Sequence, residues 1–290
     1  MDIKWLAQQT KHAAFIASKK ARLAVKNTHF KAYDLLYMNK VSPDQYTFEK
    51  ARYRRSFLNR DIVPYPDAHY ELPRVVYCFW TGENEMSEAR AHSLQVIRSV
   101  MKAAPVHLVT PENLHSYVLE DYPLHPAYER LSLVHRSDYL RAYFMHHYGG
   151  GYLDIKRIPN DWAASFELLD NDPEKWALGY QEATSRDVAK LTGNLGHDIK
   201  KFHRILIGNG AYIFKRGTPF TAEWLSEQER RLDYFYPQLI EFPGGTRGEV
   251  VGYPLSWHDL LGRVFHPLCL KFADRLIIDN RIKPEFTDYL

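Results

Sequence analysis

The segment 135–157, which reads HRSDYLRAYFMHHYGGGYLDIKR, holds the residues whose types and spacing best suit chemistry. A helical wheel places Arg141 near the middle of an apolar face and Asp138 at its edge. A guanidinium among apolar side chains is costly unless it is paired or binds an anion. Asp138 comes three residues before Arg141, so the two can meet on the helix surface. The pair is either a structural ion pair or a pair that faces a ligand with anionic and hydroxyl groups.

Three consecutive glycines, Gly149 to Gly151, end this helix and lead into a short apolar strand. Such a run permits backbone conformations closed to other residues and lets a ligand approach closely. Asp154 then lies at or just past the carboxyl end of the predicted strand. Ligands bind at that edge of open α/β sheets. Asp154 is therefore a candidate to bind sugar hydroxyls or a divalent metal.

The elements that must position these residues alternate between strands and helices. We predict strands at 74–80, 106–109, 152–155, 177–181, 206–207 and 211–214. We predict helices at 87–102 and 126–148, and helices that begin at Thr110-Pro111 and Thr218-Pro219. The first strand is apolar nearly throughout, which is typical of a strand buried on both faces. This order predicts an α/β fold with a mostly parallel sheet flanked by helices.

Composition excludes several classes of protein. The chain has 290 residues, 45% hydrophobic and 25% charged, as in ordinary soluble domains. No run of about 18 apolar residues indicates a spanning helix. Cys78 and Cys269 are the only cysteines, which excludes a disulfide framework and fits a reducing compartment. Because the first residues lack the apolar run of a signal peptide, we expect a cytoplasmic protein.

The charge is uneven along the chain. Residues 1–60 contain 13 basic and four acidic residues and carry +9, against −6 for the remainder. Residues 3–26 are predicted to form a helix with an alanine-rich arc beside a basic arc, which suits an anionic membrane surface or packing on the protein's own body. We expect a basic helical segment at 1–60, a linker at 61–73 and a catalytic domain at 74–290. We do not expect nucleic-acid binding, since no recognised reading motif accompanies the charge.

Four motifs follow one another between residues 72 and 158: VVYCFWTG at 75–82, TPENL at 110–114, SDYLR at 137–141 and YGGGYLD at 148–154. In this order they resemble the DXD-type glycosyltransferases that include capsular polysaccharide synthesis proteins, yeast-type initiating mannosyltransferases and clostridial glucosylating toxins, with the capsular branch the most similar. The segments GNGAYI and GTPF at 208–213 and 217–220 resemble the family more loosely. The resemblance implies a GT-A-like fold and sugar transfer from a nucleotide sugar to a glycan, usually with retention.

The resemblance also implies roles for single residues. Trp80 would stack on the nucleotide base, and Asn209 would reach the donor sugar or the acceptor. Asp154 would be the first acid of the DXD motif, close to the donor sugar and a metal ion. The other donor-binding residues that it implies are Thr81, Asn113, Asp138, Arg141, Gly150 and Tyr152.

The motif departs from the family at its second acid, because it reads Asp154-Ile155-Lys156. A carboxylate there helps to hold a divalent cation on the diphosphate, whereas an ammonium group cannot. Three alternatives stay open. Lys156, assisted by Arg157, stabilises the leaving diphosphate as a catalytic residue without metal. Asp154 instead keeps a manganese or magnesium ion with phosphates and water. In the third, the chain is an inactive glycan- or partner-binding relative.

A glycine-rich stretch at 243–252 precedes the segment YPLSWHD at 253–259. Long irregular segments of this kind often form active-site lids. Trp257 and His258 are therefore candidates for a lid or for the acceptor side, and the alternative is a surface loop that caps the sheet. The partners implied are a nucleotide sugar, a glycan or lipid-linked glycan, and the inner face of a membrane through residues 3–26.

Overall fold

The structure is a computed structural model that describes residues 46–60, 70–102 and 104–286, together with residues 25, 28, 32, 34 and 35. The predicted helix at 3–26 lies outside the described residues except at Val25, and so does the predicted linker up to residue 69. Within the described ranges, no helix has both the length and the apolar character that crossing a bilayer requires.

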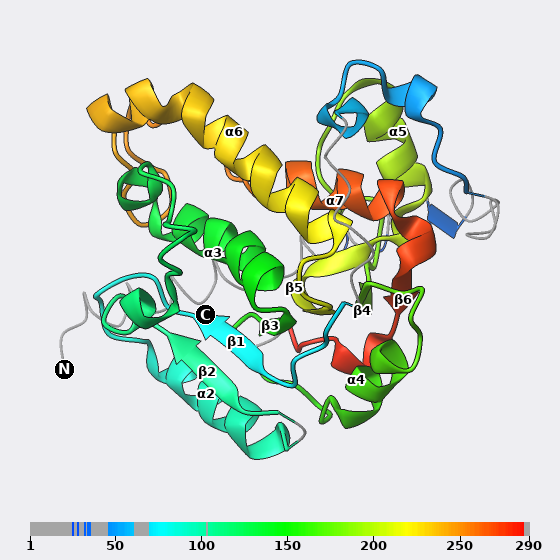
Figure 1. The fold of residues 1–290 in the computed structure, drawn as a ribbon, viewed down its shortest axis with the longest axis horizontal. Helices are drawn as coiled ribbons and strands as arrows, with labels where there is room; N and C mark the ends of the chain where they lie inside the picture. The colour runs from blue at the N-terminus through cyan, green and yellow to red at the C-terminus, as the bar shows by residue number, and fades with distance from the viewer. Residues whose placement is uncertain are drawn as a thin grey trace, which may run out of the picture.

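Six strands form one sheet in the order β2-β1-β3-β5-β4-β6. Their bounds are Val76–Phe79 for β1, Val106–Val109 for β2, Gly150–Leu153 for β3, Ala177–Gln181 for β4, Ile207–Phe214 for β5 and Leu276–Ile278 for β6. Neighbouring strands are parallel except where β5 meets β3 and β4. The predicted mostly parallel α/β sheet is therefore confirmed (Figure 1).

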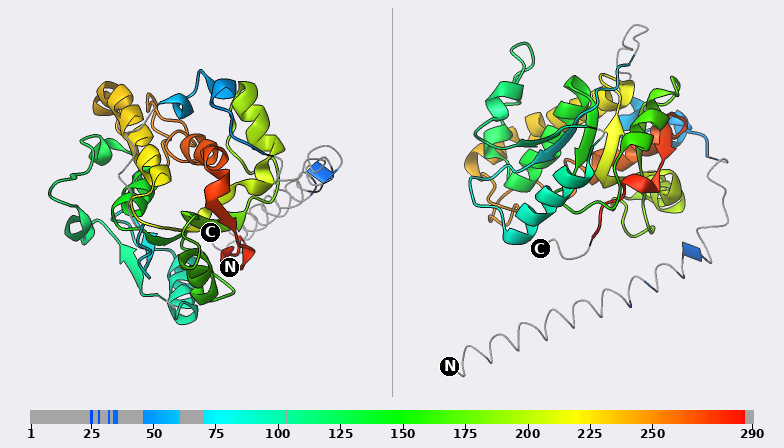
Figure 2. Two further views of the ribbon diagram at one scale, coloured as in Figure 1. Left: turned by 45° about the vertical axis from the view of Figure 1, so that its right-hand side comes forward. Right: turned by 90° about the horizontal axis from the view of Figure 1, so that it is seen from below.

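Helices cover both faces of this sheet. Their bounds are Glu88–Val100 for α2, Leu133–His147 for α3, Ala163–Asp170 for α4, Gly193–Lys201 for α5, Pro219–Glu241 for α6 and Gly262–Lys271 for α7. Figures 1 and 2 show α2 and α4 on one side and α3, α6 and α7 on the other. The side chains of β1 alternate accordingly, since Val76 and Cys78 join the core beside α2 and α4 and Tyr77 and Phe79 join the other core. All four are buried, as we predicted for this strand.

The predicted helix at Thr110-Pro111 is wrong. The chain forms a turn there, followed by the short 3-10 helix η5 (Leu114–Tyr117). The Asn113 amide closes the turn, because its Oδ1 accepts from the Thr110 N–H at 2.8 Å and its Nδ2 donates to the Leu108 carbonyl at 3.0 Å. The Thr110 carbonyl accepts from the N–H groups of Asn113 and Leu114 at 3.2 and 2.9 Å, so the chain turns once here without continuing as an α-helix.

Three other bounds differ from the prediction. The helix expected at 126–148 begins only at Leu133, because Ser132 caps it by accepting from the His135 N–H. The strand expected at 152–155 is displaced to Gly150–Leu153. The strands expected at 206–207 and 211–214 are one strand, whose polar and glycine positions at 208–210 hid its continuity.

The end of α3 and the start of β3 fix the position of the candidate site. Gly149 and Gly150 have φ angles of +68° and +85°, which side chains rarely adopt. A Cβ atom on Gly150 would lie 2.7 Å from the Val75 carbonyl oxygen. The glycines thus turn the chain sharply and bring β3 against β1, so that Asp154 follows the carboxyl end of a buried strand.

Candidate functional site

A cavity of about 540 Å³ lies at the carboxyl end of β3. Its walls come from α3, the ends of β3 and β4, the middle of β5 and the segment before α7. Seven of the predicted site residues line it: Asp138, Arg141, Asp154, Lys156, Asn209, Trp257 and His258. Residues more than 100 positions apart in the sequence thus surround one hollow, which we call the strand-end cavity.

Both carboxylate oxygens of Asp154 are occupied by other side chains. Oδ1 accepts from Arg141 Nη2 at 3.1 Å and from the Tyr152 hydroxyl at 2.7 Å, and Oδ2 accepts from Lys156 Nζ at 2.6 Å. Burial raises the pKa of Asp154, but Lys156 and Arg141 outweigh burial and bring it down to about 2. Asp154 is therefore an ionised carboxylate held between two cations.

Arg141 connects the helix to the strand ends. Its Nη1 donates to the Asn209 carbonyl at 2.9 Å, and its Nε lies 3.8 Å from Asp138 Oδ1. The guanidinium lies 4.3 Å from the centre of the Tyr152 ring, a cation–π distance. Arg141 thus pairs with acids and also contributes to the cavity wall, and its contact with a ligand stays a prediction.

Asp138 is a buried acid that faces the same cavity, with 3% of its surface exposed. Burial raises its pKa to about 7, although Arg141 lowers it and Asp154 raises it further. Its backbone carbonyl accepts from Gln228 Nε2 at 2.9 Å, which ties α3 to α6. A carboxyl group of this kind can donate or accept a hydrogen bond near neutral pH, which suits a sugar hydroxyl.

Asn209 presents a polar atom that has no partner. Its Oδ1 is buried and makes no hydrogen bond with any described residue. An unsatisfied buried acceptor is costly, and this one belongs to a residue that lines the cavity. The site therefore has an acceptor available for a ligand donor such as a hydroxyl.

The side chains that contact Asp154 are two cations and a hydroxyl rather than further acids. Among the described residues, no group of three or more His, Cys, Asp or Glu side chains could hold a metal ion. The Lys156 ammonium lies beside Oδ2, where a cation would bind, and Oδ1 is taken by Arg141 and Tyr152. Of the other cavity acids, Glu182 lies 3.3 Å from His266 Nε2, and Asp187 accepts from Thr184. The positive charges beside Asp154 in this structure belong to Lys156 and Arg141.

Three predicted donor-binding residues do not line the strand-end cavity. Trp80 follows β1, and its Nε1 donates to the Asn84 carbonyl at 2.8 Å. Thr81 lines another hollow, of about 310 Å³. Leu133 lines this hollow too, and the next residue, Val134, lines the strand-end cavity. Tyr152 is buried beneath Arg141, where it positions the guanidinium and Asp154.

The remaining two predicted donor-binding residues, Asn113 and Gly150, contact the protein's own backbone. The Asn113 side-chain amide forms hydrogen bonds within the turn after β2, and Gly150 packs against Val75 at the amino end of β3. The roles that the resemblance implies for Trp80, Thr81, Asn113 and Gly150 remain predictions.

The wall residues that the sequence analysis missed include five with polar or aromatic side chains: Tyr180, Glu182, Asp187, Lys283 and Phe286. The Lys156 ammonium lies 4.6 Å from the centre of the Phe286 ring. Residues near 283 reach the site because β6 pairs with β4. The apolar triplet 276–278 is the signal that could have indicated this last strand, and the acid directly after the predicted strand 177–181 could have indicated Glu182.

Comparison with known proteins agrees with this geometry. Residues 68–165 match the family model described as a glycosyltransferase sugar-binding region containing a DXD motif. The matched span includes Trp80, Asp138, Arg141, Asp154 and Lys156, whereas Asn209 and the 257–262 segment lie beyond it. A search of curated proteins finds no match to the chain. Residues 68–165 are thus similar to the sugar-binding region of glycosyltransferases that contains a DXD motif.

Proposed function

We propose that this chain transfers a sugar from a nucleotide-sugar donor to a glycan acceptor, and that it does so without a divalent metal. The family of residues 68–165 supports a sugar donor. The observation that carries the metal-free proposal is the pairing of Asp154 with Lys156 at 2.6 Å and with Arg141 at 3.1 Å. These contacts put two cations where a DXD site would hold a metal.

Sugar transfer needs stabilisation of the departing nucleoside diphosphate. Lys156 and Arg141 would supply charge-assisted hydrogen bonds to its phosphate oxygens. Arg141 is already fixed by Asp154, the Asn209 carbonyl and the Tyr152 ring. Little reorganisation would therefore accompany the reaction.

The proposed step retains the configuration of the sugar. The bond between the anomeric carbon and the diphosphate oxygen breaks, and the acceptor oxygen bonds to that carbon from the same face. The leaving phosphate oxygen takes the proton of the acceptor hydroxyl, so no protein nucleophile is required. Asp138 and Asn209 Oδ1 would hold sugar hydroxyls during this exchange.

The acceptor that we propose is a growing surface glycan such as a capsular polysaccharide. The support is the order of the four motifs between residues 72 and 158, which resembles the capsular branch. The enzyme would work at the inner face of the membrane, where the basic residues of 3–26 favour anionic lipid. Trp257, which is 52% exposed on the wall of the strand-end cavity, and His258 would contact the donor or the acceptor.

A thermal-shift screen of nucleotide sugars, with EDTA and with manganese, tests the donor part of this proposal. A ligand that binds the folded state raises the melting temperature by mass action. We expect at least one nucleotide sugar to raise it equally in both buffers, and we expect Asp154→Asn to weaken that shift. A shift that appears only with manganese would contradict metal-free binding.

A non-catalytic binding protein is the second candidate. The observation in its favour is the same ion pair, because Lys156 and Arg141 neutralise the acid that the family uses for metal binding. This candidate predicts nucleoside-diphosphate binding without release of sugar from any donor, in EDTA or in manganese. Release of sugar that Lys156→Ala abolishes would exclude it.

A further inference from the structure

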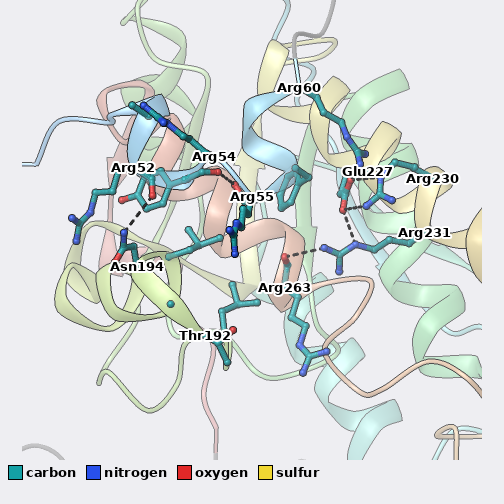
Figure 3. A pocket seen from close by; sticks show the side chains of 17 residues that line it. Arg52, Arg54, Arg55, Arg60, Thr192, Asn194, Glu227, Arg230, Arg231 and Arg263 are labelled. Atoms are coloured by element: carbon teal, nitrogen blue, oxygen red, sulfur yellow. Dashed lines mark hydrogen bonds and ion pairs between the residues drawn. The ribbon is translucent and has the colours of Figure 1, made fainter.

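A second and larger cavity, of about 980 Å³, is lined by arginines that the proposed reaction does not use. It lies between the 3-10 helices η3 (Lys50–Tyr53) and η4 (Phe57–Asn59), the start of α5, α6 and the start of α7. Figure 3 shows its lining, with Arg55 in the middle of the view and Glu227 with its arginines to one side. We call it the arginine cavity. The arginines are Arg52, Arg54, Arg55, Arg60, Arg230, Arg231 and Arg263.

The carboxylates that contact these arginines are fewer than the arginines. Glu227 is buried and accepts from Arg60, Arg230 and Arg231 at 2.7–3.1 Å. Asp198 pairs with Arg52 at 2.5 Å and Asp259 pairs with Arg263 at 2.6 Å. Among the described residues, seven guanidinium groups and three carboxylates leave an excess of four positive charges around this cavity.

Arg54 and Arg55 account for much of this excess. Both are exposed, and neither forms an ion pair with an acid in the ranges that the structure describes. The first residues of α5, from Thr192 to Leu195, line the same cavity, so the positive end of that helix adds to the field. Exposed arginines without acids around a concave site are suited to a multiply charged anion.

The remaining lining suits a ligand with more than a bare anion. Tyr53, Phe57, Leu191 and Leu195 contribute aromatic and aliphatic surface to the same cavity. Arg231 lies 5.8 Å from the centre of the Phe57 ring. A sugar or lipid portion could therefore contact this surface while the arginines bind phosphate.

The arginine cavity adjoins the strand-end cavity along one short stretch of chain. Leu261 and Gly262 line the strand-end cavity, and Arg263, the next residue, lines the arginine cavity. The start of α7 thus contributes to the walls of both cavities.

We propose that the arginine cavity binds a phosphate or diphosphate group of the acceptor, so that the acceptor is a phosphorylated glycan or glycan carrier. The identification of the ligand as the acceptor rests on the proposed transferase function. The anion site itself does not depend on that function. Guanidinium forks match phosphate oxygens in geometry and charge. A diphosphate is compact enough to use several of the arginines at once.

Calorimetric titration of the full chain with inorganic pyrophosphate tests the anion site. All variants carry Lys156→Met, which weakens binding at the strand-end cavity. The test variant adds Arg54→Ala with Arg55→Ala, and the matched control adds Arg74→Ala with Arg98→Ala, two exposed arginines outside both cavities. We expect pyrophosphate to bind at least fivefold more weakly to the test variant than to the control. A smaller difference overturns the proposal.

Two further arms separate other sources of phosphate. With Lys156 intact, nucleoside-diphosphate affinity should be the same in the Arg54→Ala, Arg55→Ala variant and the control, and its loss would assign the cavity to the donor and overturn the proposal. Vesicles of phosphatidylglycerol provide the lipid arm. The proposal would be overturned if vesicle binding depended on Arg54 and Arg55 and pyrophosphate binding did not. The cavity would then bind the phosphates of a membrane surface. Failure of the proposed function would appear instead as absent sugar transfer in the unsubstituted chain, which these titrations do not measure.

Discussion

The strand-end cavity and the arginine cavity differ in how their charged side chains are paired. In the strand-end cavity, Asp138 and Asp154 pair with Arg141 and Lys156 in one network, in which Asp138 and Lys156 are buried and the other two are partly buried. In the arginine cavity, exposed guanidinium groups outnumber the acids that contact them. Burial makes an unpaired charge expensive, whereas water tolerates one. The first cavity is therefore arranged in advance for one geometry, and the second leaves charge available for a ligand.

Removal of Arg141 is the strongest way to break this contrast. Arg141→Ala would leave two buried acids without their shared cation, and such losses cost about 3–5 kcal/mol. We expect lower unfolding free energy in chemical denaturation and no sugar transfer. Arg54→Ala, which removes an exposed arginine, should leave the unfolding free energy nearly unchanged. Equal losses in the two variants would contradict the contrast.

The pH dependence of stability tests Asp138. Its pKa is raised to about 7 in the folded chain against an ordinary value of 3.8, so the folded state binds the proton more tightly. Its contribution is therefore present at low pH and is lost as pH rises from about 4 to 7, by about 4 kcal/mol for roughly three pKa units. Asp154, with its pKa lowered to about 2, contributes stability above pH 4 that is lost on acidification.

Denaturation curves of Asp138→Asn and the unsubstituted chain between pH 4 and 8 measure this difference. The asparagine variant keeps the size of the side chain and cannot titrate. We expect its stability relative to the unsubstituted chain to rise steadily with pH. A constant difference would show that Asp138 has an ordinary pKa.

Substitution of Lys156 separates charge from metal binding. Lys156→Ala should lower kcat by about 10²–10³-fold, as the loss of one preorganised donor does elsewhere. Lys156→Arg should retain more activity, because it keeps a cation at the same position. Lys156→Asp recreates an Asp-x-Asp motif, and activity in manganese above that of the unsubstituted chain would show that a metal serves this fold better.

The smallest effects concern the aromatic residues at the edges. Trp80→Ala should weaken nucleotide binding about tenfold if the base stacks there, since stacking contributes about 1–3 kcal/mol. Trp257→Ala should change the affinity for the bare nucleotide less than twofold, because Trp257 would contact sugar or acceptor. The opposite order of effects in a nucleotide titration would move the base to the Trp257 side of the cavity.

Much of the fold could be predicted from the sequence because capping residues and apolar patterns agreed with the tertiary packing. Ser87 and Thr218 cap helices close to their predicted starts, and β2 and β4 have their predicted bounds. The failures arise where one side chain overrides a pattern, as Asn113 does after β2. The helices α4, α5 and α7 and the strand β6 were not predicted, because they are short.

From helix and strand patterns, the sequence predicted only those residues of the candidate site that lie close to one another along the chain. Asp138, Arg141 and Asp154 lie within 17 consecutive residues, and helix and strand periodicity place them together. Tyr180 and Lys283 required the pairing of β4 with β6. The arginine cavity required contact between residues 52–60 and α6, more than 160 positions away, so the sequence revealed only a basic segment.

The most direct test of the central claim is the initial rate of sugar release from the donor found by thermal shift, measured in excess EDTA and in manganese. Because Lys156 and Arg141 occupy Asp154, we predict rates within about twofold of each other, as no metal would supply the missing charge. Complete loss of activity in EDTA, restored by manganese, would contradict the account.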